Sequence, residues 1–134
     1  MANISGQTQI LYFDSADYSM FSEDMNIGSY LAVDNNKEYA YTVSDEGNIY
    51  CIDFNYVRYS FIYRVNAVSS AISAKNNSIY VGDNAGILWV FDNTYHAISW
   101  AFNATSPIVG GIAVNNNIAY IGTEDGTFYA VKSI

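Results

Sequence analysis

Histidine and cysteine, the side chains used most often as bases, nucleophiles and metal ligands, occur once each in this chain. His96 falls in a predicted turn and Cys51 in a predicted strand, about 45 residues apart. A structural zinc site needs four such ligands and acyl transfer needs a nucleophile beside a base, so neither residue indicates catalysis. The glycines also form no phosphate-binding or dinucleotide-binding pattern. We therefore predict no catalytic residues, no metal site and no cofactor.

Acidic residues outnumber basic ones by 13 to five, which gives a formal net charge of −8. Such a chain repels phosphate backbones and anionic lipids, so we predict no nucleic-acid partner and no membrane insertion, and a basic protein remains a possible partner. The sequence shows neither a signal peptide nor an apolar run long enough to span a bilayer. The compartment is therefore left open: cytoplasm, or a surface or virion structure.

Three stretches repeat one pattern, in which a tyrosine stands six residues before a glycine and an apolar, aromatic run follows. They are YTVSDEGNIYCID (41–53), YVGDNAGILWVFD (80–92) and YIGTEDGTFYAVK (120–132). Their glycines, Gly47, Gly86 and Gly126, are 39 and 40 residues apart. A period of about 40 residues built from short strands is typical of propeller blades, so we predict an all-β repeat protein.

Tight turns are predicted at two places in each repeat. Glycine suits a hairpin turn with positive φ, and the asparagine pairs at 35–36, 76–77 and 116–117 suit the preceding hairpin. The strand after each glycine, such as 87–91, does not alternate with polar residues, which favours a sheet that is covered on both faces. We expect about four strands in each repeat and no helix.

The repeats resemble the blades of quinoprotein-like (pyrroloquinoline-quinone-type) β-propellers, whose pattern is roughly Val-Tyr-Val-Gly-Ser-x-Asp-Gly-x-Leu-Tyr-Ala-Leu-Asp, with Trp eight residues later. Residues 120–131 follow it closely, and Asp92 with Trp100 keeps the family's spacing. The usual Thr-Gly between them is replaced by Tyr95-His96. The resemblance covers residues 28–132 and implies the propeller fold, but no particular function, because such folds host many.

The resemblance also implies that a group of acidic residues lies on one face of the ring. In that family the loops that enter the inner strands and the glycine turns share one face of the ring, and here these segments hold seven of the 13 acids. They are Glu23, Asp24, Asp45, Glu46, Asp83, Glu124 and Asp125. The simpler interpretation is a solvated face, because turns favour such residues. The sharper one is an acidic interaction face for a basic protein or Ca²⁺.

Aromatic residues at equivalent repeat positions form the second candidate set. They are Tyr50, Trp89 and Tyr129 after the glycine turn, and Phe61 and Trp100 in the last strand. Packing between blades explains them most simply, because aromatic side chains bury a large area. The alternative is a set of aromatic pockets between blades that binds glycans.

The strand count predicts an incomplete set of blades. Residues 1–27 hold two strands, at about 9–14 and 18–23, that match the end of a blade; the three repeats occupy about 28–66, 67–106 and 107–134. The last repeat lacks an outer strand, and natural propellers close with about four to eight blades. We therefore predict a homo-oligomer in which segment 18–22 completes the blade of a neighbour by strand exchange. Two chains would close a six-bladed ring, or the contact would propagate as a filament.

These observations favour a non-enzymatic structural or interaction module, a β-propeller scaffold or a building block of a cell-surface or virion assembly. A lectin- or adhesin-like protein that uses aromatic pockets between blades is the first alternative. The second is an accessory or remnant of a quinoprotein enzyme. A quinone site in that family needs a larger ring and a dedicated ligand set, which this sequence does not provide.

Overall fold

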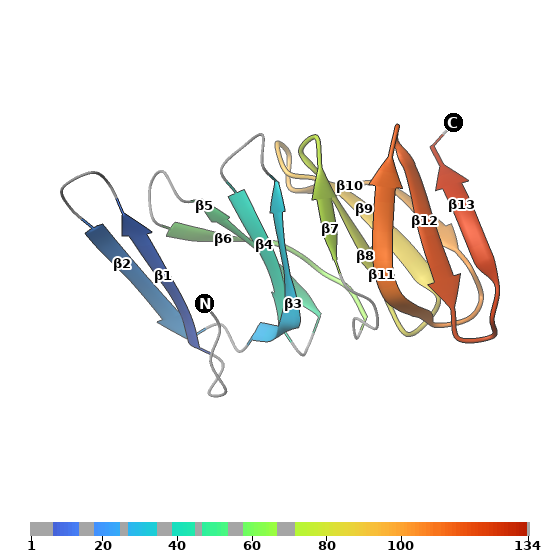
Figure 1. Ribbon diagram of the computed structural model, residues 1–134, viewed down its shortest axis with the longest axis horizontal. Helices are drawn as coiled ribbons and strands as arrows, with labels where there is room; N and C mark the ends of the chain where they lie inside the picture. Colours follow the sequence, from blue (N-terminus) through green and yellow to red (C-terminus); the bar gives the residue numbers. More distant parts are fainter. Residues whose placement is uncertain are drawn as a thin grey trace.

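The chain folds into β-strands joined by short turns (Figure 1), in a computed structural model that describes residues 7–13, 18–24, 27–34, 39–44, 47–53, 58–66 and 72–133. Within these ranges there are thirteen strands and no helix, so none is available to span a membrane. The strands are β1 (Gln7–Phe13), β2 (Tyr18–Asp24), β3 (Ile27–Asp34), β4 (Tyr39–Ser44), β5 (Asn48–Asp53), β6 (Arg58–Arg64), β7 (Ser73–Lys75), β8 (Ser78–Gly82), β9 (Ile87–Asp92), β10 (Ala97–Asn103), β11 (Ile108–Asn115), β12 (Ile118–Thr123) and β13 (Phe128–Lys132).

The strands form four antiparallel sheets that follow the order of the chain. β1 and β2 make a two-stranded sheet, β3–β6 the first sheet, β7–β10 the second sheet and β11–β13 the third sheet. Within a sheet each strand pairs with its neighbour in sequence, as in a meander of hairpins. The predicted all-β fold, with three repeats of three or four antiparallel strands, is confirmed.

The first two strands pair with each other. The register runs from Gln7 opposite Asp24 to Phe13 opposite Tyr18, so β2 has its partner within the same chain. The strand exchange predicted for segment 18–22 would therefore have to separate β2 from β1, or to carry both strands to the neighbour together.

The turns have the backbone conformation that the sequence predicts. In the pairs at 76–77 and 116–117, all four asparagines have φ between 51° and 66°, and Gly47, Gly86 and Gly126 have φ between 87° and 89°. Asparagine and glycine adopt this left-handed region at a lower steric cost than β-branched residues do. The asparagine pair at 35–36 lies outside the described residues.

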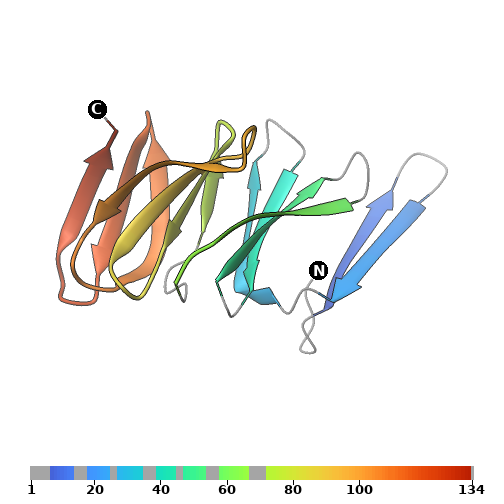
Figure 2. The ribbon, with the colours of Figure 1, turned by 180° about the vertical axis from the view of Figure 1, so that it is seen from behind.

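The sheets stack face to face in a row, from the β1–β2 sheet to the third sheet (Figures 1 and 2). One apolar cluster joins the first and second sheets, and it includes Tyr41 and Phe91. Another joins the second and third sheets, and it includes Leu88, Val90 and Ile121. The second sheet is thus covered on both faces. This explains why β9 carries apolar side chains on both sides rather than alternating with polar ones.

Candidate functional site

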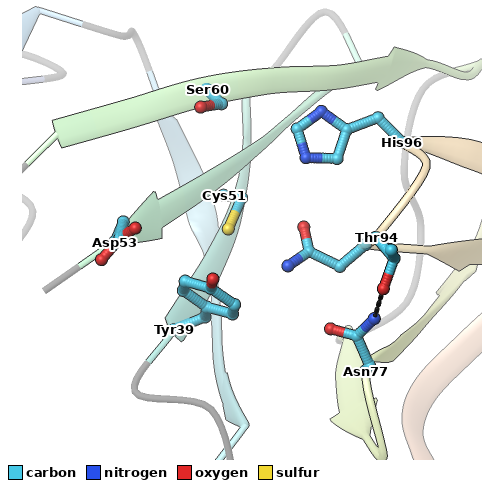
Figure 3. A pocket seen from close by; sticks show the side chains of 8 residues that line it. Tyr39, Cys51, Asp53, Ser60, Asn77, Thr94 and His96 are labelled. Atoms are coloured by element: carbon cyan, nitrogen blue, oxygen red, sulfur yellow. Dashed lines mark hydrogen bonds between the residues drawn. The ribbon is translucent and has the colours of Figure 1, made fainter. Parts of the chain in front are cut away.

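A cleft of about 370 Å³ lies between the first and second sheets. It is lined by Tyr39, Cys51, Asp53, Ser60, Asn77, Asn93, Thr94 and His96. Strands β4, β5 and β6 of the first sheet supply one wall, and two turns of the second sheet supply the other (Figure 3). The stacking of the sheets therefore brings the chain's only cysteine and only histidine to one cleft, which their separation in sequence does not reveal.

Hydrogen bonds hold the turns of this second wall in place. The backbone N–H of Asn93 donates to the carbonyl oxygen of Asn77 at 3.0 Å, and Nδ2 of Asn77 donates to Oγ1 of Thr94 at 2.5 Å. The backbone N–H of Asn77 in turn donates to a carboxylate oxygen of Asp34, on the first sheet, at 2.8 Å. The two turns of this wall are thus hydrogen-bonded to each other, and one of them is hydrogen-bonded to the first sheet.

The thiol of Cys51 is unsuited to nucleophilic chemistry. Burial raises its pKa to about 12, the charge of Asp53 adds to the rise, and side-chain hydrogen bonds with Asn93 and Tyr41 oppose it. Because the thiolate is the reactive form, this cysteine is inert at neutral pH. The side chain of His96 is exposed, at a turn position with φ 50°. Among the described residues, no three His, Cys, Asp or Glu side chains are grouped closely enough to hold a metal ion.

Asn93 contributes an unusual polar group to the cleft. Its side chain is only 7% exposed, and among the described residues its Oδ1 atom has no hydrogen-bond partner. Buried acceptors in folded proteins are nearly always paired with a protein donor or an ordered water. This oxygen is therefore an acceptor that a donor within the cleft could satisfy.

Asp83 directly follows β8, in the turn that contains Gly86, at the other end of this strand from Asn77. Its hydrogen bonds stabilise the fold. Its side chain is 0% exposed. One carboxylate oxygen accepts from the backbone N–H groups of Ala85 and Ile87, at 3.0 and 2.9 Å. The other accepts from Nε1 of Trp89 at 2.8 Å and from Nδ2 of Asn66 at 3.1 Å. The carboxylate thus fixes the glycine turn, an indole ring and the segment after β6.

Asp83 does not belong to the predicted acidic interaction face. Its carboxylate is fully buried and accepts hydrogen bonds from four donors, so it cannot contact a partner. Glu124 and Asp125 are exposed. For Glu23 and Asp24 the structure describes the backbone alone, at the end of β2, and Asp45 and Glu46 lie outside the described residues. An acidic face thus remains a prediction that the described part of the chain supports at one turn.

The hydroxyl of Thr123 and the backbone N–H of Thr127 both donate to Oδ1 of Asp125, at 2.5 and 3.0 Å. The bond from Thr123, followed by those from Thr127, lowers the pKa of Asp125. The carboxylate is thus used within its own turn while it stays open to solvent.

Four of the aromatic candidates, Tyr50, Trp89, Trp100 and Tyr129, pack within and between the sheets. Trp89 is packed against the cluster between the first and second sheets, and Trp100 and Tyr129 against the cluster between the second and third. Tyr50 meets the ring of Phe61 edge-on, with centroids 6.1 Å apart. None of the four lines the cleft, whose aromatic residue is Tyr39.

The outward face of the third sheet is open. Phe128 is 70% exposed, and its ring stacks on the half-exposed Tyr120 with centroids 6.2 Å apart. Ala130, on the same side of β13, is also exposed. The side chains on the other side, Tyr129 and Val131, pack against the second sheet. The third sheet therefore presents an apolar face that no described residue covers.

Comparison of the sequence with protein-family models and with curated proteins gives no match. The fold, in contrast, is similar to that of solved β-propeller structures. BamB from Moraxella catarrhalis aligns with a TM-score of 0.67 at 14% identity, over 94% of this chain and 48% of that one. The β-propeller domain of Cps50 (Swd1) from Myceliophteria thermophila aligns with a TM-score of 0.63 at 8% identity, over 82% of this chain and 42% of that one.

A computationally designed protein, Ika4, aligns with a TM-score of 0.61 at 14% identity, over 71% of this chain and 60% of that one. The chain thus spans between about two fifths and three fifths of these three structures. Identities this low show the fold alone. The chain has β-propeller blades, and its stack of sheets corresponds to part of a ring.

Proposed function

We propose that this chain is a non-enzymatic β-propeller module that acts as a scaffold, and that it assembles by covering the open face of its third sheet with a second copy. The observation that carries the proposal is the exposure of Phe128 and Ala130, beside the partly exposed Tyr120. Residues at the same repeat positions of the second sheet are buried against the next sheet. The equivalent faces of the first and second sheets are covered by the next sheet. An apolar face that is left uncovered in this way indicates an interaction surface.

The edge of the third sheet supports the same conclusion. In the first two sheets the strand that corresponds to β13 pairs with a fourth strand, β6 or β10. Among the described residues β13 has β12 as its only strand partner. An unpaired edge presents free backbone donors and acceptors to a further strand.

The glycine turn of the third sheet is open in a matching way. In the second sheet, a Cβ atom added to Gly86 would come within 2.7 Å of the backbone of Ser106, which follows the fourth strand, β10. A Cβ atom added to Gly126 would meet nothing within 4 Å. The segment after β10 fills the space beside Gly86, and the corresponding space beside Gly126 is not filled by any described residue. The segment that follows a strand donated by another copy could occupy it.

A second copy is a suitable partner because the sheets stack head to tail. Each interface joins the tyrosine-bearing face of one sheet, with Tyr41 or Tyr80, to the opposite face of the next. The third sheet offers the first kind of face, and the β1–β2 end of another copy would meet it with the second kind (Figure 1). Such a heterologous contact closes into a ring, in the simplest case of two chains, or extends as a filament. A building block of a cell-surface or virion assembly needs one of these two properties.

A catalytic function has little support among the described residues, because the Cys51 thiol is protonated at neutral pH and the candidate acids are either buried in hydrogen bonds or solvated. We further propose that the blades are of the quinoprotein-like type, on the strength of the pattern at 120–131.

Solution mass, measured by light scattering on a sizing column, tests the assembly. We expect twice the chain mass for a closed ring, or larger species that grow with concentration for a filament. Phe128→Glu should reduce either form to the monomer, because a charge cannot be buried unpaired at the interface. The control is Tyr95→Glu, which places the same charge on another exposed aromatic residue, in the turn between β9 and β10.

A stable monomer at micromolar concentration would contradict the proposal. An assembly that Phe128→Glu leaves intact, or that Tyr95→Glu also dissolves, would show that the third sheet's face is not the contact.

A further inference from the structure

The cleft between the first and second sheets holds a buried side chain with a hydrogen-bond acceptor that no donor among the described residues satisfies. Asn93 lines it, and the Oδ1 atom of this residue is buried and has no hydrogen-bond partner among the described residues. The backbone N–H of the same residue donates to the carbonyl oxygen of Asn77, and its side chain is only 7% exposed. A ligand that donates a hydrogen bond would remove the free-energy cost of this oxygen.

The other lining groups define the chemistry of such a ligand. Ser60 and Thr94 offer hydroxyls, Asn77 an amide, and Tyr39 an aromatic ring and a hydroxyl, and none of the described lining residues is a lysine or arginine. Hydroxyls and amides both donate and accept, so they suit a ligand whose groups do the same. The nearby carboxylate of Asp53 and the chain's net charge of −8 disfavour an anion.

We propose that this cleft binds a neutral, hydroxyl-rich ligand of the size of a small sugar, with one of its hydroxyls donating to Oδ1 of Asn93. The volume of about 370 Å³ is near the lower end of the range for small-molecule sites. The binding is reversible and involves no covalent step. The site lies within one chain, so it goes beyond the scaffold function and does not depend on the assembly.

The position differs from that of the aromatic pockets expected from the sequence. Those pockets would use Tyr50, Trp89, Trp100 or Tyr129, which pack in the protein interior or against neighbouring rings. The cleft instead relies on residues from three strands and two turns that share no sequence pattern.

Ligand-observed saturation-transfer NMR with free glucose, galactose, mannose and N-acetylglucosamine as probes tests the proposal. We expect at least one of these neutral sugars to bind, and glucuronate, which carries a carboxylate, to bind more weakly than glucose. Asn93→Leu should weaken the binding by about tenfold, the value of one hydrogen bond. The same change should leave the thermal midpoint unchanged or raise it, because it replaces an unpaired oxygen with an apolar group of similar size.

The repeat supplies a matched pair of controls. Ser60 and Ser99 occupy equivalent positions of the outer strands β6 and β10, 39 residues apart, and only Ser60 lines the cleft. Ser60→Ala should weaken sugar binding, whereas Ser99→Ala should not. Phe128→Glu should leave binding unchanged whether or not the chain assembles, so the two proposals can fail separately.

Three results would overturn the inference. They are the absence of binding by all four neutral sugars, binding that Asn93→Leu leaves intact, and tighter binding of glucuronate than of glucose.

Discussion

The second and third sheets carry the same repeat pattern but differ in what covers them. In the second sheet Tyr80, Leu88 and Val90 are buried against the third sheet. In the third sheet the residues 40 positions later form an open face, in which Phe128 replaces Leu88. The repeat therefore sets which side chains share a face, and the neighbouring sheet decides whether this face is core or surface.

The glycine turns of the same two sheets give a second contrast. Their backbones match: Gly86 donates to the carbonyl oxygen of Asp83, and Gly126 to that of Thr123. The side chains that fix them differ. Asp83 bonds the N–H of Ile87, whereas in the third sheet Asp125 bonds the equivalent N–H, that of Thr127. The carboxylate of Asp83 is buried and reaches two further elements, and the carboxylate of Asp125 is exposed and accepts from Thr123 and Thr127 within its own turn.

The largest expected difference between the sheets is at these two acids. Asp83→Ala leaves four donors without their charged acceptor, so we expect the free energy of unfolding to fall by about 3–5 kcal/mol. Asp125→Ala should change the urea midpoint only slightly, because water replaces the lost acceptor. Urea unfolding followed by tryptophan fluorescence measures both. Equal losses for the two variants would contradict the assignment of Asp83 as the structural acid.

A smaller difference is expected at the stacked faces. Leu88→Ala removes a fully buried side chain and should cost about 3 kcal/mol of unfolding free energy. Phe128→Ala should cost about 0.5 kcal/mol or less in the monomer, as at other exposed sites. The comparison must be made at concentrations too low for assembly. A loss at Phe128 as large as that at Leu88 would mean that the third face is already covered within one chain.

The smallest expected effect is the pH dependence that Asp125 contributes. Its folded-state pKa lies below the ordinary value because of the bonds from Thr123 and Thr127. Its ionised form therefore stabilises the fold above the unfolded-state pKa, and this contribution is lost as the pH falls through the lower folded-state pKa. Asp125→Asn should flatten the stability curve below about pH 4, and Glu124→Gln, the neighbouring control, should not. Identical curves for Asp125→Asn and the wild type would contradict the shift.

The fold could be predicted from the sequence largely because its signals are local. Glycine at a positive φ and paired asparagines define the hairpins without reference to the rest of the chain, as Gly86 and the turn at 76–77 demonstrate. The apolar run of β9 indicated a sheet covered on both sides, and the second sheet is covered in this way.

Part of the candidate site could not be predicted in this manner. Asp83 was grouped with the solvated acids because turns favour aspartate. A signal was present, since Asp83 aligns with Ser44 and Thr123 of the other repeats rather than with Asp45 and Glu124. The cleft left no such signal, because Cys51, Asn93 and His96 belong to two different sheets and meet only when these stack.

The sequence by itself determined the period, the turns and the faces along which side chains align, because φ preferences and the two-residue alternation of strands act over a few residues. Only the tertiary structure decided burial. It made Leu88 core and Phe128 surface, gave the carboxylate of Asp83 four donors and left Oδ1 of Asn93 with none among the described residues. The reason is that desolvation and hydrogen-bond satisfaction depend on what the next sheet places opposite each residue, and the next sheet lies some 40 residues away along the chain.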